Sequence, residues 1–156
     1  MSFPQRKSIR LSRDAYARGN AYFITISTFM RHPWFKRHPD LAASATERLN
    51  ATADERGTYL FAWCIMPDHI HILLKDDNIV SFVRIFKGRL TPVARNIDSE
   101  RSLWQRSFYD HALRKEESLN EIALYIWMNP VRAGIVAEAK DYPWSGSVVW
   151  PDWKEY

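Results

Sequence analysis

Cysteine is nearly absent from this sequence, since Cys64 is the only one among 156 residues. A single thiol excludes an intramolecular disulfide and a zinc site made of several cysteines. Such a composition is typical of proteins kept in a reducing compartment. Because Cys64 falls within an apolar run, we expect it to be a small buried strand residue.

Long apolar runs are missing as well. No stretch approaches the roughly 20 apolar residues that a membrane-spanning helix needs, and the first residues, MSFPQRKSIRLSRD, carry charges without the apolar core of a signal peptide. The sequence has five glycines, with no low-complexity tract and no glycine-rich phosphate-binding loop. With 46% hydrophobic and 26% charged residues, it has the composition of a globular protein. We therefore expect one domain over residues 1–156, located in the cytoplasm and with no membrane partner.

Positive charge is unevenly distributed, although the formal net charge is only +4. Basic residues crowd into a predicted N-terminal arm, residues 1–20: Arg6, Lys7, Arg10, Arg13 and Arg18. Such an arm can neutralise phosphates and contribute sequence-independent affinity for nucleic acid. A solvated tail would have the same composition, so the arm alone leaves both interpretations open.

The hydrophobic pattern predicts strands and helices in a mixed order. Runs of β-branched and aromatic residues predict strands over 21–28, 58–67, 69–75 and 103–114. Apolar residues at helical spacing predict helices over 39–57, 78–95 and 118–134, the last with a capping box of Ser118 and Glu121. This is the β-α-β-β-α-β pattern of a ferredoxin-like antiparallel sheet, of the α+β class, with an additional C-terminal helix. An aromatic C-terminal tail, residues 141–156, follows.

Two histidines stand one residue apart in the third predicted strand, within MPDHIHILLK. Because side chains alternate along a strand, His69 and His71 project to one face while Ile70 and Ile72 project to the other. Two neighbouring imidazoles can share a cation, or each can be satisfied by a hydrogen bond within the fold. The pair alone does not decide between these, and a metal site would need a third ligand.

The last predicted helix offers that ligand. Tyr125 and Asn129 are four residues apart and therefore share a helix face. An amide oxygen can bind a hard cation, and a tyrosine can act as a nucleophile. Two imidazole nitrogens and an amide oxygen would leave positions on Mg²⁺ or Mn²⁺ open for phosphate oxygens. The alternative is that Tyr125 is a core aromatic and Asn129 simply precedes Pro130 at a helix end.

Four separated segments resemble the motifs of one protein family: MPDHIHILL, WQRSFYDHALRKEESL, YIWMNPVRAG and DYPW (141–144), in that order. Together with the strand YFITISTFMR, they resemble the REP-associated tyrosine transposases. These are relatives of the small single-tyrosine insertion-sequence transposases in the HUH nuclease superfamily. The resemblance runs from about Arg6 to Ser145.

The resemblance implies a site and a reaction. His69 and His71 match the His-hydrophobic-His strand that binds the divalent metal in the family. Tyr125 matches the nucleophile, and Asn129 matches the residue that completes the metal site. The implied activity is cleavage and strand transfer of single-stranded DNA beside a palindromic, REP-like hairpin, with Mg²⁺ or Mn²⁺ and a 5′-phosphotyrosine intermediate.

The resemblance also bears on assembly. REP-associated members resemble monomers with the tyrosine in cis, whereas the insertion-sequence relatives are dimers that exchange this helix. The connection from the fourth strand to the last helix, residues 115–120, is short, which favours packing of the helix on its own sheet. We therefore expect a monomer with a complete site in one chain, with a dimer as the alternative.

A DNA partner implies basic contacts, for which the candidates are Arg10, Arg13, Arg18, Arg84, Lys87, Arg95 and Arg132. Arg84, Lys87 and Arg95 share the helix that directly follows the histidine strand. Asp110 and His111, adjacent on the fourth strand, are either groups that support the site or a solvated pair. The seven tryptophans are numerous for this length, and we expect most of them in the core.

Other functions remain as alternatives. A two-histidine phosphoesterase would need a second His-x-Ser/Thr motif, which His32, His38 and His111 do not provide. A non-catalytic, domesticated hairpin-binding protein of the same fold would keep the basic residues and lose the metal ligands or the tyrosine, all of which are present. A structural or protein-interaction domain would leave the histidines and the tyrosine apart in space.

Overall fold

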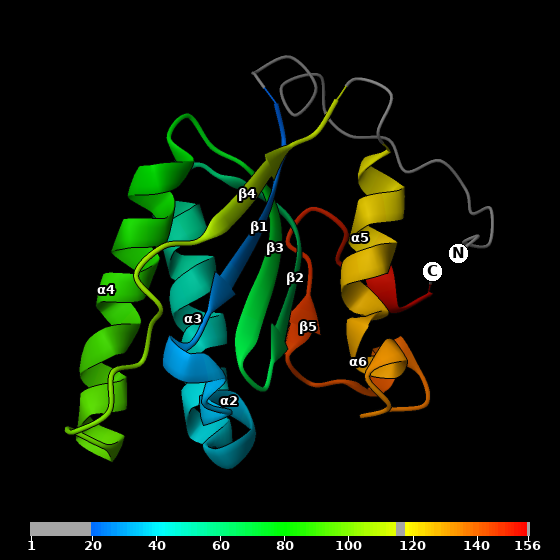
Figure 1. Cartoon of the computed structure of the whole chain (residues 1–156). Helices are drawn as coiled ribbons and strands as arrows, with labels where there is room; N and C mark the ends of the chain where they lie inside the picture. The colour runs from blue at the N-terminus through cyan, green and yellow to red at the C-terminus, as the bar shows by residue number, and fades with distance from the viewer. Residues whose placement is uncertain (1–19, 115–117, 156) are drawn as a thin grey trace.

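The computed structural model of the chain describes residues 20–114 and 118–155 (Figure 1). Its centre is a five-stranded antiparallel sheet with the strand order β4-β1-β3-β2-β5. The strands are β1 (Tyr22–Ser27), β2 (Tyr59–Met66), β3 (His69–Lys75), β4 (Tyr109–Ala112) and β5 (Ser145–Gly146). The predicted α+β class and ferredoxin-like strand order are confirmed, and β5 is an edge strand that the sequence pattern did not reveal.

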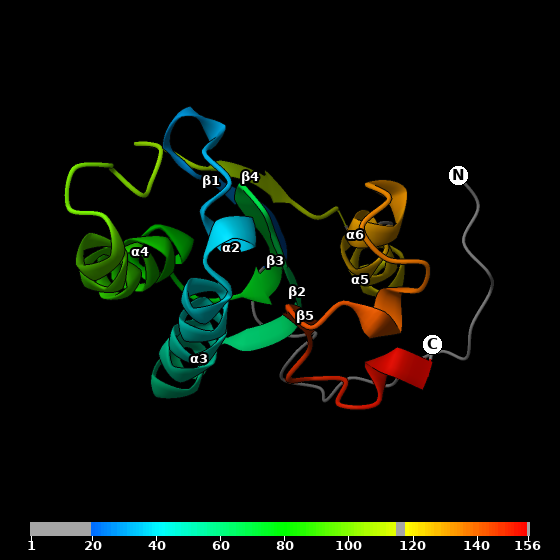
Figure 2. The ribbon, with the colours of Figure 1, turned by 90° about the horizontal axis from the view of Figure 1, so that it is seen from below.

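Helices cover both faces of the sheet (Figure 2). One face carries α3 (Pro39–Arg56) and α4 (Ile79–Ile97), and the other carries α5 (Leu119–Trp127) and α6 (Asn129–Arg132). The short helical turns are η1 (Phe29–Arg31), α2 (Trp34–Arg37), η2 (Ala139–Asp141) and η3 (Trp153–Glu155). None of the helices in the described residues is long and apolar enough to cross a membrane.

The alternation of side chains along β3 separates two hydrophobic cores. Ile70 and Ile72 are fully buried in the core beneath α3 and α4. Leu73 is buried in the second core, beneath α5. His69 and His71 are four and two residues before Leu73 on the same strand, so their side chains point with it toward the face covered by α5.

The aromatic C-terminal segment packs into the second core as far as the structure describes it. Tyr142, Trp150 and Trp153 are buried there. The hydroxyl of Tyr142 donates to the carbonyl of Ile65 at 2.5 Å, and burial raises the pKa of this phenol. The DYPW segment therefore fixes the edge of β2, against which α5 rests.

The fourth strand is shorter than predicted. The expected strand over 103–114 reduces to β4, and an isolated bridge joins Trp104 to Thr28 further upstream. The indole N–H of Trp104 donates to the carbonyl of Lys87 at 3.1 Å, and its ring packs on Phe86 with centroids 6.0 Å apart. This contact with α4 draws the start of the segment away from a regular ladder.

The last predicted helix is divided in two. The N–H of Met128 still donates to the carbonyl of Leu124 at 2.9 Å. Pro130 has no N–H, and its ring would clash with the carbonyl of Ile126 in a continuous helix. A second short helix, α6, therefore starts at Asn129 and ends before Gly134, whose φ is 73°. The break lies directly at a predicted site residue.

A buried ion pair at the end of α3 gives a prediction about stability. The side chain of Asp76 is 3% exposed and accepts hydrogen bonds from Arg56 at 2.8 Å, Thr58 at 2.5 Å and the N–H of Asn78 at 2.8 Å. Burial alone would raise the pKa of Asp76, but these bonds outweigh it, so its pKa lies below the usual value. We expect Asp76→Asn to lower the free energy of unfolding by about 2 kcal/mol at neutral pH.

The pH dependence of this loss follows from the direction of the shift. Because the pKa of Asp76 is lowered on folding, its stabilisation is present above the unfolded value of about 3.9 and disappears as the pH falls through the folded value. Urea denaturation at pH 7 and at acid pH should show the difference between wild type and Asp76→Asn shrinking in acid. Asp54→Asn serves as the control, because Asp54 is an exposed acid on α3, the helix that carries Arg56. A difference that is independent of pH would contradict the prediction.

Candidate active site

The histidine pair lies on the sheet face beneath α5. His69 and His71 are on β3, and their ring centroids are 4.6 Å apart at an interplanar angle of 73°. The ring of Phe23, on β1, stacks on His71 with centroids 5.2 Å apart. The structure thus brings the two imidazoles together on one face, as the strand period predicts.

Each imidazole is held through its Nδ1 atom. The Nδ1–H of His69 donates to Oδ1 of Asp68 at 2.7 Å. The Nδ1 atom of His71 is hydrogen-bonded to the hydroxyl of Thr25 at 2.9 Å. The Nε2 atoms are therefore the ones that remain for a ligand, and a fixed Nδ1 partner is the usual companion of a metal-binding histidine.

Burial sets the charge of both imidazoles. It lowers the pKa of His71 to about 3, with further contributions from the nearby His69 and the positive charges of Arg132 and Arg31. Burial also lowers the pKa of His69, although Asp68 acts in the opposite direction. Both rings are consequently neutral at physiological pH, which is the form that coordinates a metal.

The side-chain amide of Asn129 lies next to the pair. Its Nδ2 atom is 3.4 Å from Nε2 of His69. Because the nitrogen and oxygen of an amide exchange places by a half-turn of its terminal group, Oδ1 can face the same point. Two imidazole nitrogens and one amide oxygen form a donor set that suits Mg²⁺ or Mn²⁺ with open positions. No three His, Cys, Asp or Glu side chains in the described residues gather into a metal-binding cluster, so the donor set at this site depends on the amide of Asn129 beside the two imidazoles.

Tyr125 lies on α5 beside the same group of rings. Its side chain is 41% exposed, and its ring meets Phe23 edge-on with centroids 6.3 Å apart. The guanidinium of Arg132 lies 4.0 Å from the centre of the Tyr125 ring and donates to the Tyr125 carbonyl at 2.7 Å. Since Phe23 contacts both His71 and Tyr125, the predicted nucleophile and the histidine pair belong to one neighbourhood within one chain.

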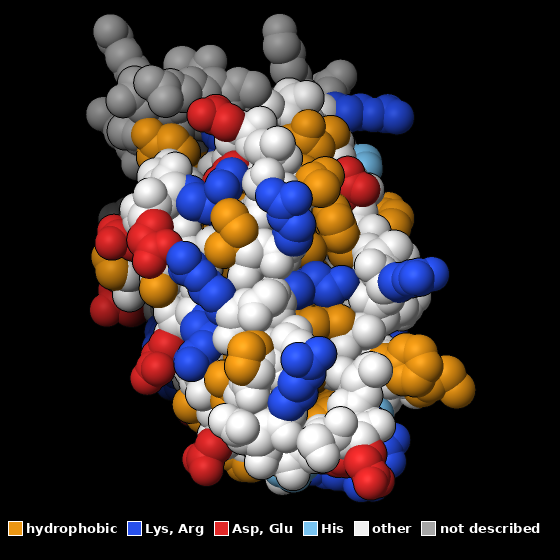
Figure 3. All heavy atoms as spheres, turned by 90° about the vertical axis from the view of Figure 1, so that its left-hand side faces the viewer, with side chains coloured by type: hydrophobic (Ala, Val, Ile, Leu, Met, Phe, Trp, Pro, Cys, Tyr) orange, Lys and Arg blue, Asp and Glu red, His pale blue; other side chains and the backbone are white. Residues whose placement is uncertain are grey.

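Among the basic candidates that the structure describes, only Arg132 is part of this neighbourhood. Arg84, Lys87 and Arg95 lie on α4, which covers the opposite face of the sheet, where Lys and Arg side chains gather on the surface (Figure 3). The ammonium group of Lys87 donates to the carbonyl of Gln105 at 2.8 Å, and burial lowers its pKa. The other candidates, Arg10, Arg13 and Arg18, lie outside the described residues. Their role as DNA contacts stays a prediction.

The side chains of Asp110 and His111 lie on opposite faces of the sheet. His111 is opposite Phe23 in the β1–β4 ladder, and Asp110 is opposite Ile24. Because adjacent strand residues alternate, His111 points to the face of the histidine pair and Asp110 to the face of α3 and α4.

Three further residues lie near the site although the sequence patterns did not predict them there. Asp68 directly precedes His69, and that adjacency was the available indication. Thr25 is 46 positions from His71, and no local pattern predicts that contact. Tyr109 is opposite Thr25, which is in turn opposite His71, so the three share one row of the sheet face. Tyr109 is 61% exposed.

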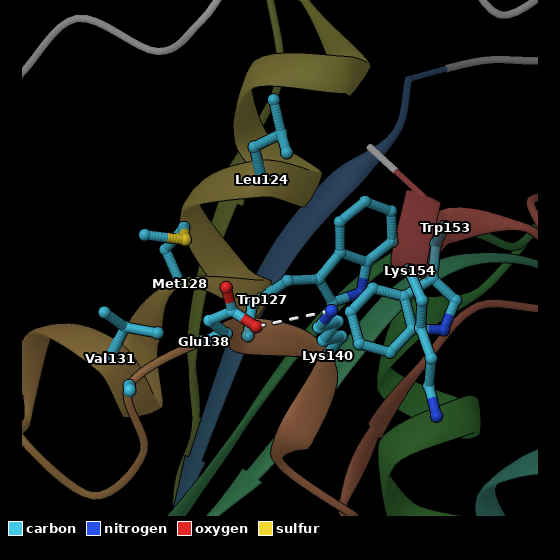
Figure 4. Close-up of a pocket in the computed structure, with 10 residues that line it drawn as sticks. Leu124, Trp127, Met128, Val131, Glu138, Lys140, Trp153 and Lys154 are labelled. Carbon is cyan, nitrogen blue, oxygen red and sulfur yellow. Dashed lines mark ion pairs between the residues drawn. The ribbon is translucent and has the colours of Figure 1, made fainter.

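A separate cavity lies against α5 and takes no part in this site. Its volume is about 350 Å³, and its lining includes Trp127, Met128, Lys140 and Trp153 (Figure 4). The rings of Trp127 and Trp153 stack with centroids 4.9 Å apart. No predicted metal ligand or nucleophile lines the cavity.

The fold and the site together define a class of protein: a ferredoxin-like sheet that presents a histidine pair to a helix carrying a tyrosine. Comparison with known proteins identifies the family. Residues 18–129 match the model of the family described as "Transposase IS200 like", and the chain belongs to this family of transposases.

Relatives with known names agree with this assignment. A REP-associated tyrosine transposase of Escherichia coli K12 is 26% identical to the chain over 141 residues, covering 85% of the chain and 79% of the relative. A Haemophilus influenzae protein assigned provisionally to the same group is 29% identical over 147 residues, covering 85% of the chain and 82% of the relative. The resemblance to REP-associated tyrosine transposases is thereby confirmed.

A solved structure shares the fold. It is a REP-associated tyrosine transposase bound to a REP hairpin, and it superposes with a TM-score of 0.66 at 24% identity. The match covers 93% of the present chain and 82% of that protein. The arrangement of sheet and helices described above is therefore similar to the fold of that transposase.

Proposed function

We propose that this protein cleaves single-stranded DNA beside REP-like hairpins and transfers the strand through a 5′-phosphotyrosine bond to Tyr125. Mg²⁺ or Mn²⁺ would be held by His69, His71 and Asn129. The observation that carries the proposal is that His69, His71 and Asn129 lie together with the exposed Tyr125 on the side of the sheet that α5 covers. The hairpin substrate is supported by the hairpin bound to the structurally similar transposase.

The covalent step uses the phenol oxygen of Tyr125. This oxygen forms a bond to the phosphorus of the scissile phosphodiester, and the bond from phosphorus to the 3′-oxygen of the preceding nucleotide breaks. The phenol proton leaves, and the departing DNA strand acquires a 3′-hydroxyl. A bound divalent cation supplies Lewis-acid polarisation of the phosphate. Because the energy of the phosphodiester is retained in the Tyr125 bond, attack by a DNA 3′-hydroxyl can rejoin strands without a nucleotide cofactor.

The test is incubation of the full chain with labelled single-stranded hairpin oligonucleotides and Mn²⁺, followed by denaturing electrophoresis. A 5′-phosphotyrosine bond predicts that a 3′-end label migrates with the protein, while a 5′-end label is released on a free fragment. Omission of the metal should remove both products. Hairpin binding without any adduct would overturn the proposal and favour the alternative, a non-catalytic hairpin-binding protein of the same fold.

We expect one chain to build the whole site. Phe23 packs on His71 and on Tyr125 of the same chain, at 5.2 and 6.3 Å between ring centroids. Mixing Tyr125→Phe protein with a His69→Ala/His71→Ala variant should therefore restore no adduct. A helix-exchanged dimer would combine an intact tyrosine with an intact histidine pair, so recovery of the adduct in the mixture would contradict a cis site. Sedimentation of the wild type should give a monomer mass.

Tyr109 gives a prediction about DNA binding. It is 61% exposed and lies in the sheet row of Thr25 and His71. An exposed aromatic beside the cleavage site can stack on an unpaired base, which contributes about 1–3 kcal/mol per base. We expect Tyr109→Ala to weaken binding of single-stranded DNA roughly 5- to 100-fold in fluorescence anisotropy. Tyr109→Phe retains the ring and should bind as wild type, and equal affinities for all three proteins would refute the stacking role.

A further inference from the structure

The turn after β1 contains the only non-glycine residues with positive φ in the described part of the chain. Met30 has a φ of 55° and Arg31 a φ of 56°. This left-handed conformation is unfavourable for residues that carry a Cβ atom, and two in succession are uncommon. Such strain persists only where the surrounding structure imposes it, and it is concentrated at functional sites.

Backbone hydrogen bonds fasten this turn to the site. The N–H of Thr28 donates to the carbonyl of Asp68 at 2.9 Å, and the N–H of Phe29 donates to the carbonyl of Leu103 at 2.9 Å. Thr28 is fully buried. The strained turn is therefore attached to the hairpin turn that immediately precedes His69.

The consequence is the position of the Arg31 guanidinium. Its Nε atom donates to Oδ2 of Asp68 at 3.1 Å, and one Nη atom donates to the hydroxyl of Ser27 at 3.2 Å. The other oxygen of the same carboxylate accepts from Nδ1 of His69 at 2.7 Å. Asp68 thus bridges Arg31 and His69, with one oxygen for each.

Stability does not account for this arrangement. The side chain of Arg31 is 56% exposed and that of Asp68 is 28% exposed. An ion pair so accessible to water adds little to folding stability, whereas the left-handed backbone opposes it. The orientation of His69 is the property that the pair can determine.

We propose that Arg31 is a positioning residue that acts through Asp68 to orient His69 for binding the divalent cation. Arg31 fixes the carboxylate, the carboxylate fixes the Nδ1–H tautomer and the ring plane of His69, and Nε2 is presented to the metal. This inference rests on the proposed function, because it concerns the same metal site. Outer partners of this kind typically change metal affinity 10- to 100-fold.

The test measures Mn²⁺ binding by the full chain without DNA, using titrations followed by electron paramagnetic resonance. Arg31→Ala and Asp68→Ala should each weaken binding about 10- to 100-fold. Arg31 also approaches His69 directly, with its second Nη atom 3.4 Å from Nδ1, but an Nδ1–H that donates to Asp68 cannot accept from this atom. The double variant should therefore bind no more weakly than Asp68→Ala alone. Arg101→Ala, which removes the arginine of a comparably exposed pair with Asp98, should bind as wild type. Thermal unfolding should be alike for Arg31→Ala and Arg101→Ala.

Three outcomes would overturn the inference. One is wild-type Mn²⁺ affinity in Arg31→Ala, even if DNA cleavage is lost, because Arg31 would then act on the DNA directly. Another is a loss of Mn²⁺ affinity in the double variant that equals the product of the losses in the two single variants. The third is an equal loss in Arg101→Ala. Failure of the proposed function is recognised separately, since His69→Ala/His71→Ala would then bind Mn²⁺ as the wild type does.

Discussion

Tyr125→Phe should abolish the covalent protein–DNA adduct while hairpin binding remains nearly unchanged. Phenylalanine retains the ring that meets Phe23 and lies beneath the Arg132 guanidinium. The substitution removes only the oxygen that would form the bond to phosphorus. Because the side chain is 41% exposed, loss of the hydroxyl should cost little stability.

The measurement pairs adduct formation on denaturing gels with anisotropy of a labelled hairpin. Tyr109→Phe is the matched control, because it also removes an exposed phenol, in this case from the sheet face that α5 covers. It should form the adduct at the wild-type level. An adduct in Tyr125→Phe would assign the nucleophile elsewhere, and loss of the adduct in both variants would show that the assay does not report on Tyr125 specifically.

The order of the main elements could be predicted because each is determined by nearby residues. Gly57, with a φ of 65°, ends α3 as its position suggests, and Asn78 caps α4 by accepting from the N–H of Ser81 at 3.1 Å. The capping bond at Ser118 forms in the same way. Such features depend on local backbone chemistry, so the sequence alone reveals them.

The elements that differ from the prediction depend on contacts between residues far apart in the sequence. The start of the fourth strand is drawn toward α4 by Trp104, and β5 forms because residues after Tyr142 reach the edge of β2. Neither contact leaves a periodic pattern in its own segment. The break of the last helix at Met128 could have been predicted from the sequence, because Pro130 is incompatible with a continuous helix.

In the candidate site too, the features set by local sequence could be predicted and those set by distant contacts could not. The shared face of His69 and His71 follows from the period of a strand, and that of Tyr125 and Asn129 from the period of a helix. Asp68, which holds the ring of His69, is its neighbour in the sequence, but the other partners belong to distant segments. Thr25 is on β1, and Arg31 is 38 positions before His69. Their placement depends on the sheet register and on a strained turn, which local patterns do not encode.

The second large effect is expected from His71. His71→Ala should reduce metal-dependent cleavage by more than the roughly 10- to 100-fold that loss of an outer partner costs a metal site, because it removes a ligand itself. Burial lowers the pKa of His71 to about 3, so the native ring offers a neutral nitrogen throughout the physiological pH range. DNA affinity should change little, since phosphate contacts depend on cationic side chains rather than on a neutral imidazole.

Removal of the His71 ring also removes its stacking on Phe23, so stability requires a control. His38→Ala deletes another partly buried imidazole that contacts an aromatic ring, with centroids 5.7 Å from Trp34, and His38 is not one of the predicted ligands. Comparable melting temperatures for the two variants, with cleavage lost only in His71→Ala, would assign the effect to the metal site. Cleavage that survives in His71→Ala and in the presence of a chelator would contradict a metal-dependent mechanism, because the reaction would then need neither the ligand nor the cation.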